Sequence, residues 1–220
     1  MRILHLSDTH GAHAQMGDLP AADIIVHSGD VGMAGTVEEV TDFLRWFLRL
    51  PYRHKIFVPG NHDCCLLGAK AGFVHSAHSR QIKLACLPSL NRRARGLPEG
   101  CHLLYNSGVE IDGVKFYGVP CFVEFAVTGE DDKYYASIPA DTDILVTHQP
   151  PHGILDRAGK TNFGSRSLLA RVREISPRLH LFGHIHDAYG EHRLGPTRFV
   201  NGAMMDEQYR LVHPPRVIEC

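Results

Sequence analysis

Residues 179–186 read Leu-His-Leu-Phe-Gly-His-Ile-His, a short apolar run that ends in a glycine followed by two histidines. The run has the length of a buried strand, and the glycine closes it as a turn residue. The same arrangement occurs four more times, where the runs 2–6, 23–26, 55–58 and 144–146 lead into Ser-Asp-Thr-His, His-Ser-Gly-Asp, Pro-Gly-Asn-His-Asp and Thr-His. The sequence therefore predicts five buried strands, each ending in a polar turn.

Helices are predicted between these strands. Residues 36–50 carry apolar side chains at helical spacing, with Thr36 as N-cap and Pro51 as the stop, and residues 165–175 repeat the spacing. Residues 109–117 predict a hairpin around an Asp-Gly turn. Strands alternating with helices indicate a mixed α/β layered domain. In such sheets ligands collect at the carboxyl ends of the strands, where all five polar turns fall.

The composition is that of a soluble globular protein. The chain has 220 residues, 44% of them hydrophobic and 21% charged, which fits a single domain spanning residues 1–220. Lys plus Arg (23) nearly balance Asp plus Glu (24), so no overall field attracts nucleic acid or an anionic membrane. No signal-type or membrane-spanning apolar stretch is visible, and the six cysteines form no C-x-x-C pair. We expect a cytoplasmic protein in which a small anionic substrate would have to be attracted locally.

The polar turns contain side chains that bind metal ions. They hold seven candidate ligands, namely Asp8, His10, Asp30, Asn61, His148, His184 and His186. Carboxylate and amide oxygen combined with imidazole nitrogen favours manganese, iron or zinc over a structural zinc site or a calcium cage. Seven ligands are too many for one tetrahedral ion and suit two ions that share a carboxylate. Such a pair keeps a surplus of about one positive charge, which attracts phosphate and lowers the pKa of a bridging water to give hydroxide.

The order of these motifs resembles the calcineurin-like metallophosphoesterases. The resemblance covers residues 8–186 and implies a four-layer α/β/β/α sandwich with the metals at the sheet edges. It implies one ion held by Asp8, His10, Asp30 and His186, and a second held by Asp30, Asn61, His148 and His184. Asp30 would bridge the two ions. His62 would contact the phosphate, beside Asn61, and would protonate the leaving oxygen or stabilise charge on it.

The second motif narrows the resemblance. Asp30 is followed by Val31 and Gly32, without the Asp-Arg pair that the phosphoprotein phosphatases carry there. Three further runs surround the motifs: Pro51-Tyr52-x-x-Lys55, Thr147-His148-x-Pro150-Pro151-x-Gly153-x-Leu155-Asp156, and Pro177-x-Leu179-His180-x-Phe182-Gly183. With these runs the chain resembles the metallophosphoesterase-domain-containing branch of the class III cyclic-nucleotide phosphodiesterase type. This implies hydrolysis of small, including cyclic-nucleotide, phosphodiesters with two divalent ions, manganese first and iron, zinc, cobalt or nickel as alternatives. A phosphomonoesterase or nuclease on the same site, and more remotely a non-catalytic scaffold, remain open, as does the oligomeric state.

Several further residues receive weaker predictions. His152, Phe163, Arg166 and residues 122–125 are candidates for the pocket wall, with core packing as the alternative. We expect His5, His27 and His180 to pack inside strands. For His13 we expect a surface position, with support of a metal ligand as the alternative. Asp63 would orient His62 or cap the next helix. Oxidation of Cys64 or Cys65 would disturb the site unless these thiols are buried, and Arg92–Arg95 are expected to form a solvated face.

Overall fold

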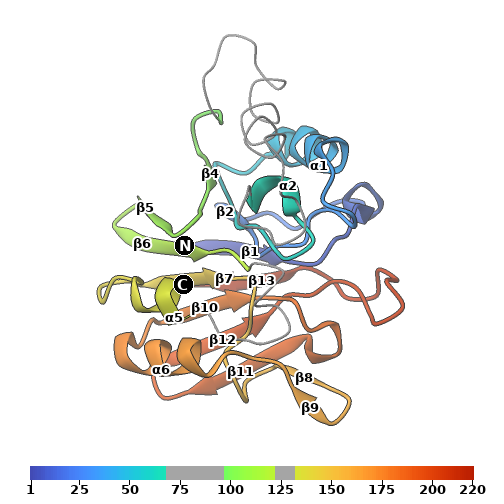
Figure 1. The fold of residues 1–220 in the computed structure, drawn as a ribbon. Helices are drawn as coiled ribbons and strands as arrows, with labels where there is room; N and C mark the ends of the chain where they lie inside the picture. Colours follow the sequence, from blue (N-terminus) through green and yellow to red (C-terminus); the bar gives the residue numbers. More distant parts are fainter. Residues whose placement is uncertain (68–96, 122–131) are drawn as a thin grey trace.

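Two β-sheets lie face to face in the centre of the molecule (Figure 1). The computed structural model describes residues 1–67, 97–121 and 132–220. In the first sheet the strand order is β13 (Arg216–Glu219), β1 (Arg2–Leu6), β2 (Ile24–His27), β3 (His54–Phe57) and β4 (Cys101–Leu103). Strands β1 to β4 are parallel, and β13 joins the edge antiparallel.

The second sheet has six strands. Their order is β11 (Gly190–Leu194), β12 (Thr197–Asn201), β10 (Leu179–Phe182), β7 (Ile144–Thr147), β6 (Val114–Val119) and β5 (Ser107–Ile111). The four inner strands are parallel, and β11 and β5 are antiparallel edges. The five predicted strands and the predicted hairpin, now β5–β6, are confirmed. A small hairpin of β8 (Arg157–Ala158) and β9 (Thr161–Asn162) lies outside both sheets.

The helices cover the outer faces of the sheets. Helix α1 (Val37–Arg49) begins at a capping box in which Thr36 and Glu39 exchange hydrogen bonds, and α6 (Arg166–Ile175) begins at Ser165, as predicted. Shorter elements are α2 (Cys64–Leu67), α5 (Asp132–Ala136) and the 3₁₀ turns η1 (Ala12–Gln15) and η3 (His186–Ala188). No helix of the described residues is long and apolar enough to cross a membrane.

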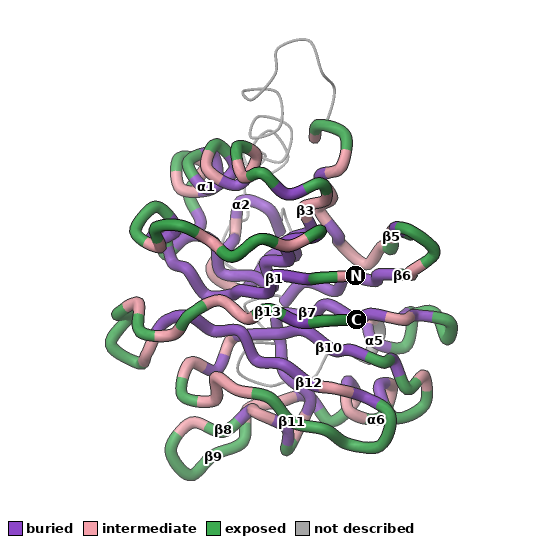
Figure 2. Tube along the Cα trace, turned by 180° about the vertical axis from the view of Figure 1, so that it is seen from behind, coloured by how far each residue is buried: buried purple, intermediate pink, exposed green. Residues whose placement is uncertain are grey.

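Buried apolar clusters separate the layers. Alternate residues of a strand point to opposite faces, so Leu4 packs toward α1 while Ile3 packs between the sheets. The same alternation sends Ile144 of β7 into the inter-sheet cluster and Leu145 toward α6. Figure 2 shows the buried strands stacked through the centre and the exposed residues at the connecting loops. The order helix, sheet, sheet, helix confirms the four-layer α/β/β/α sandwich.

Hydrogen bonds tie the carboxyl ends of the two sheets together. Just beyond β1, the backbone N–H of Ser7 donates to Gly202 at 2.9 Å, and its carbonyl accepts the N–H of Met204 at 3.0 Å. The N–H of Cys121, after β6, donates to Pro59, after β3, at 3.1 Å. The polar turns of both sheets therefore meet at one edge of the molecule.

One prediction from the sequence is wrong, and two others concern residues that the structure does not describe. His13 is buried, with its ring against Phe43 and Trp46, and its Nε2 lies 3.2 Å from Asp42, so the surface position predicted for it is wrong. The expected pocket residues 122–125 and the cluster Arg92–Arg95 lie outside the described residues.

Candidate metal centre

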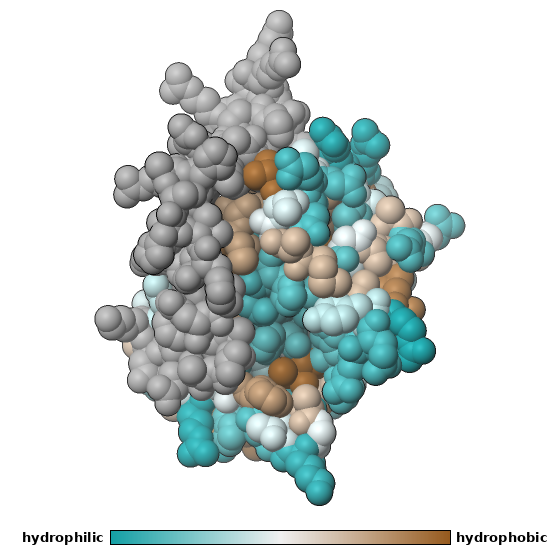
Figure 3. All heavy atoms as spheres, turned by 45° about the vertical axis from the view of Figure 1, so that its right-hand side comes forward, coloured by the Kyte–Doolittle hydropathy of each residue, from teal (hydrophilic) through white to brown (hydrophobic). Residues whose placement is uncertain are grey.

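A polar cavity of about 450 Å³ opens where the strands of both sheets end. Figure 3, which brings the right-hand side of Figure 1 forward, shows hydrophilic residues gathered near the middle of that face. The lining of the cavity includes six of the site residues that the sequence predicts, namely His10, Asp30, Asn61, His62, His184 and His186. The other two, Asp8 and His148, are fully buried beneath it.

Asp8, His10 and His186 form a first candidate metal-binding group. One potential ligand atom from each lies within 4.8 Å of the others. His186 Nε2 is 3.5 Å from Asp8 Oδ1 and 3.3 Å from His10 Nε2. These residues follow β1 and β10, one strand from each sheet.

Asp30, His148 and His184 form a second group within the same distance limit. His148 Nε2 lies 3.3 Å from Asp30 Oδ2 and 3.0 Å from the amide oxygen of Asn61. The rings of His148 and His184 meet edge to face at 5.1 Å. Asn61 therefore faces this second group, where the resemblance places it.

Asp30 lies between the two groups. Its Oδ2 is 3.3 Å from His148 Nε2 and 3.8 Å from His10 Nε2, so one oxygen faces a histidine of each group. The backbone N–H of His184 donates to both oxygens of Asp8 at 3.0 and 3.1 Å, which links the groups a second time. The geometry is that of one continuous centre with a carboxylate at its middle.

Three of the histidines are oriented by backbone carbonyls. The Nδ1 atoms of His10, His148 and His186 lie 3.1, 2.9 and 2.9 Å from the carbonyl oxygens of Gly32, Ser28 and Asp206. A carbonyl accepts only, so each Nδ1 carries a proton, and in the neutral ring each Nε2 turns a lone pair inward. The Nε2 atoms of His10 and His186 then face each other at 3.3 Å as two acceptors, an arrangement that a cation between them stabilises. The residues present therefore fit divalent transition metals.

The carboxylates control the charge of the centre. Burial favours the neutral form of Asp8 and Asp30, but the surrounding histidines outweigh it and hold the pKa of both carboxyls below its usual value. Burial also opposes a charged His148, yet Asp30 and Asp8 raise its pKa to about 9. A proton therefore occupies the metal-free site at neutral pH, and a bound ion has to displace it.

The backbone is strained at the predicted ligands. Asp8, His10, Asp30 and His184 have φ angles of 54°, 40°, 56° and 70°, in the left-handed region that side chains other than glycine rarely adopt. Strained residues of this kind persist where surrounding structure holds them, and they cluster at functional sites. In this structure the four strained residues lie just after strand ends and contribute side chains to the two candidate metal-binding groups.

Glycines in the motifs allow the side chains to approach. A Cβ at Gly183 would overlap with the Asp8 carboxylate and the Ser7 hydroxyl, and one at Gly60 would overlap with Asp30. The spacing of the motifs thus has a steric reason as well as a chemical one.

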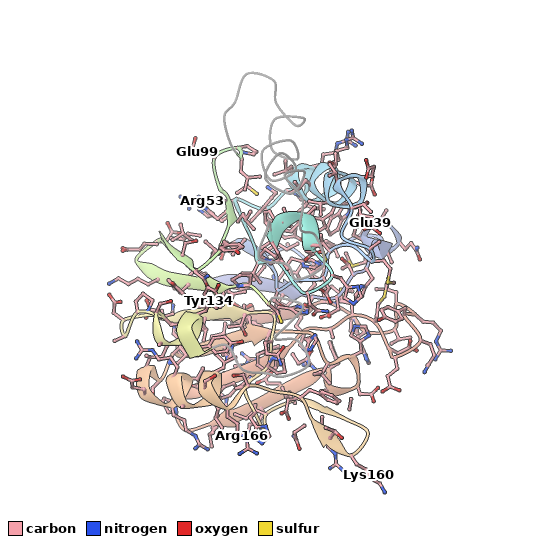
Figure 4. The ribbon with its side chains drawn as sticks, in the orientation of Figure 1. Glu39, Arg53, Glu99, Tyr134, Lys160 and Arg166 are labelled. Carbon is pink, nitrogen blue, oxygen red and sulfur yellow. The ribbon has the colours of Figure 1, made fainter. Side chains whose placement is uncertain are left out.

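His62 lies beside the two groups at the cavity wall. Its backbone N–H donates to Asp30 Oδ1 at 2.8 Å, and its Nδ1 lies 2.6 Å from the Met33 carbonyl oxygen. The carboxylate of Glu39, labelled in Figure 4, accepts the N–H groups of Met33 and Ala34 and so fixes the loop that holds this carbonyl. The Nε2 of His62 is left to face the cavity.

The side chain of Asp63 has neither of the two predicted roles, although its backbone carbonyl accepts the N–H groups of Leu66 and Leu67 at the start of α2. Its fully buried carboxylate accepts the backbone N–H groups of Gly60, Asp30, Val31 and Gly32 at 2.8 to 3.1 Å. It therefore joins the turn after β3 to the turn after β2 and fixes the backbone of Asp30.

The sequence match decides the family. Residues 1–188 match the family model described as calcineurin-like phosphoesterase. This chain belongs to that family. Metallophosphoesterase domain-containing protein 1 of Homo sapiens is 33% identical, over 99% of this chain and 70% of its own length. UPF0046 protein K07C11.7 of Caenorhabditis elegans is 31% identical, over 99% and 74%.

Solved structures share the fold at lower identity. One chain aligns over 99% of this phosphoesterase and 98% of its own length with a TM-score of 0.65 at 14% identity. GAP50, described as the anchor in the inner membrane complex of Plasmodium, aligns over 98% and 75% with a TM-score of 0.52 at 12% identity. These likenesses show the fold alone, and function depends on the site.

The cavity rim contains residues that sequence reasoning missed. They are Ala158, Ile185, Asp187, Glu207 and Tyr209. The predicted wall residues His152, Phe163 and Arg166 do not line this cavity: His152 pairs with Asp156 at 3.8 Å, and Arg166, labelled in Figure 4, is exposed at the start of α6. Asp187 could have been predicted at the cavity, because it directly follows the predicted ligand His186. Glu207 and Tyr209 belong to no recognisable motif.

The histidines inside the strands are packed, as predicted. His5, His27 and His180 are fully buried and hydrogen-bond through Nε2 to the hydroxyls of Ser28, Thr9 and Thr147 at 2.9 to 3.0 Å. Burial lowers the pKa of each to about 3, so all three stay neutral and support the strand ends without charging.

Proposed function

We propose that this family member is a dinuclear-metal-dependent phosphodiesterase that hydrolyses small diesters, cyclic nucleotides among them. The observation that carries the proposal is the position of Asp30, whose Oδ2 faces His148 of one group at 3.3 Å and His10 of the other at 3.8 Å. A carboxylate oxygen at this position suits a site in which two neighbouring cations share one ligand.

The candidate ligands would divide between two ions, as the resemblance implies. Asp8, His10, Asp30 and His186 would hold one ion, and Asp30, Asn61, His148 and His184 the other. Oxygen and imidazole donors without thiolate favour manganese, with iron, zinc, cobalt and nickel as alternatives. Bound there, two divalent ions would polarise the phosphoryl group and lower the pKa of a water they share.

His62 would act as the acid. Its Nδ1–H donates to the Met33 carbonyl, so the imidazolium form places its second proton on Nε2, toward the cavity. Transfer of that proton to the leaving ester oxygen returns His62 to the neutral tautomer that the Met33 carbonyl already selects. The hydrogen bond from its backbone N–H to Asp30 Oδ1 keeps the acid beside the shared carboxylate.

Hydrogen bonds from neighbouring residues hold the candidate ligands in place. The carbonyls of Gly32, Ser28 and Asp206 fix three imidazole rings, and Asp63 fixes the Asp30 turn. Ligands held in this way lose little freedom when an ion or a phosphate binds.

Hydrolysis of bis(p-nitrophenyl) phosphate tests the proposal. We expect manganese to stimulate hydrolysis by the purified chain, and Asp30→Asn to lower kcat/KM by about a thousandfold or more. Asp112→Asn, at the exposed turn between β5 and β6, is the matched control and should retain activity. Full activity in Asp30→Asn would overturn the mechanism. Metal-replete wild-type protein without hydrolase activity would instead favour the scaffold alternative.

A further inference from the structure

The rim of the cavity beside the first group is built from the C-terminal part of the chain. Asp187 follows the predicted ligand His186, while Glu207 and Tyr209 come from the turn 206–210. All three side chains line the cavity, but none belongs to the predicted ligand set.

Asp206 ties this turn to the metal centre. Its carbonyl oxygen lies 2.9 Å from both the Nδ1 of His186 and the backbone N of Tyr209. Its carboxylate accepts the backbone N–H groups of Gln208 and Arg210 and the Arg210 Nε, at 2.7 to 3.0 Å. The position of Tyr209 is therefore fixed relative to His186.

Tyr209 presents an aromatic ring at the mouth of the site. Its ring meets those of His10 and His186 edge to face at 4.9 and 5.4 Å, yet the residue is 45% exposed. Its φ is 57°, so the turn holds it in a strained conformation instead of letting it relax. An exposed aromatic ring held beside a phosphate site offers a surface on which a second ring can pack.

The rim is acidic. The exposed carboxyl groups of Glu207 and Asp187 lie in hydrogen-bond contact with each other on the cavity lining, so both add negative charge to the rim. No lysine or arginine of the described residues lines the cavity. Lys160, at the tip of the β8–β9 hairpin near the lining residue Ala158, points away from the body of the molecule (Figure 4).

We propose that Tyr209, Glu207 and Asp187 form a specificity rim that selects monoanionic phosphodiesters carrying an aromatic group and disfavours dianionic phosphomonoesters. The proposal rests on the proposed phosphodiesterase function and names the substrate class of that site.

The charges support this selection. Two divalent ions, two aspartates and a hydroxide leave a surplus of about one positive charge, which attracts either kind of ester. The rim carboxylates add negative charge nearby, and repulsion grows with the charge of the substrate. A monoester carries nearly two negative charges at neutral pH and above, whereas a diester carries one. The rim therefore penalises the monoester more.

Charge selection is measured with two chromogenic substrates. We compare kcat/KM for bis(p-nitrophenyl) phosphate and p-nitrophenyl phosphate at about pH 8.5, above the second pKa of a monoester. The double variant Asp187→Asn/Glu207→Gln should lower the diester-to-monoester ratio about three- to tenfold at low salt, through faster monoester hydrolysis, and the effect should shrink in high salt. Glu38→Gln, an exposed position on α1, should leave the ratio unchanged. A ratio in the double variant equal to that of the wild type would overturn the charge selection.

The aromatic contact is measured with Tyr209→Asn, because asparagine tolerates the left-handed backbone of this turn. We expect KM for bis(p-nitrophenyl) phosphate to rise about fivefold and KM for methyl p-nitrophenyl phosphate, which lacks the second ring, to change little. Equal changes for both substrates would overturn the role of Tyr209.

A binding experiment separates the rim from catalysis. Calorimetry on manganese-loaded protein compares dianionic phenylphosphonate with monoanionic diphenylphosphinate, neither of which can be hydrolysed at an ester bond. The double variant should tighten the binding of the dianionic phosphonate more than that of the monoanionic phosphinate. This result without any hydrolysis would reject the proposed function and keep the rim. Hydrolysis that depends on Asp30 with unshifted binding would reject the rim alone.

Discussion

The carboxylate of Asp63 accepts the backbone N–H of Asp30 at 2.9 Å, although Asp63 lines no part of the cavity. It also accepts the N–H groups of Gly60, Val31 and Gly32. A fully buried side chain thus holds in place the carboxylate that lies between the two candidate metal groups. The geometry of the site therefore depends on this buried hydrogen bond as well as on the candidate ligands.

Asp63→Asn should damage both stability and metal binding. The amide oxygen of asparagine replaces only one of the two carboxylate oxygens. The NH₂ group in place of the other oxygen faces backbone N–H donors, with which it cannot form hydrogen bonds. We expect the free energy of unfolding to fall by about 2–4 kcal/mol in urea titrations, and bound metal to fall with it. Asp18→Asn, an exposed substitution, is the control and should change neither. A folded Asp63→Asn protein with full metal content would contradict the role given to Asp63.

Gly183→Ala should disturb the first metal group. The added Cβ would overlap with the carboxylate of Asp8 and the hydroxyl of Ser7, so Asp8 has to move away from His186. We expect a loss of about 1–3 kcal/mol of stability and of one bound ion per chain, measured by unfolding and by elemental analysis. Gly190→Ala is the matched control, because its Cβ would meet Leu155 only at 3.5 Å. Equal metal content in the two variants would remove the steric argument.

Metal affinity should rise with pH. Asp30 and Asp8 raise the pKa of His148 to about 9 against the effect of burial, so an entering ion displaces a proton below that pH. Each displaced proton makes affinity rise about tenfold per pH unit, and the rise from His148 should level off near pH 9. Manganese titrations from about pH 6.5 to 9.5 check this expectation. An affinity independent of pH would mean that no proton is displaced.

The metal-free protein should show the opposite trend. The folded-state pKa of His148 lies above its unfolded value, so its contribution to stability is complete below about pH 6.5. That contribution is lost as pH rises through 9. Urea unfolding of chelator-treated protein should therefore give a lower free energy of unfolding at about pH 10 than at about pH 7, and the reverse order would contradict the charge state assigned to His148.

Mild peroxide should leave activity unchanged. Cys65 is buried, and burial together with the nearby Asp63 raises the pKa of the half-buried Cys64 thiol, so little reactive thiolate forms. The structure thus favours the packing alternative over the oxidant sensitivity that the Cys64-Cys65 pair suggested. Metal-replete wild-type protein and Cys64→Ser should keep equal activity after peroxide. A loss confined to the wild type would restore the oxidation hypothesis.

That the candidate ligands would meet at one edge was predictable, because local pattern and chemistry agree there. Each apolar run is long enough for a strand, and parallel strands deliver their carboxyl ends to the same edge. His148 and His186 are 38 positions apart in the sequence numbering, yet the fold brings both to that edge through β7 and β10. The helix caps Thr36 and Ser165 were equally readable, because capping is a local interaction.

The rest depends on tertiary contacts that leave no local pattern. Asp63 stands next to His62, which suggested a partner for it, but its carboxylate turns to backbone amides of another turn. Glu207 and Tyr209 reach the cavity only because β12 returns the chain beside β10. His13 was expected at the surface, because the residues beside it in the sequence do not indicate that its ring packs against Phe43 and Trp46 of α1.

Metal stoichiometry tests the central claim most directly. Wild-type protein loaded with manganese and freed of excess ion should retain two ions per chain by elemental analysis, and Asp30→Asn should lose both or bind them far more weakly. His186→Ala and His148→Ala, one from each group, should each keep one. Two tightly held ions in Asp30→Asn, or one in the wild type, would contradict a centre that shares Asp30.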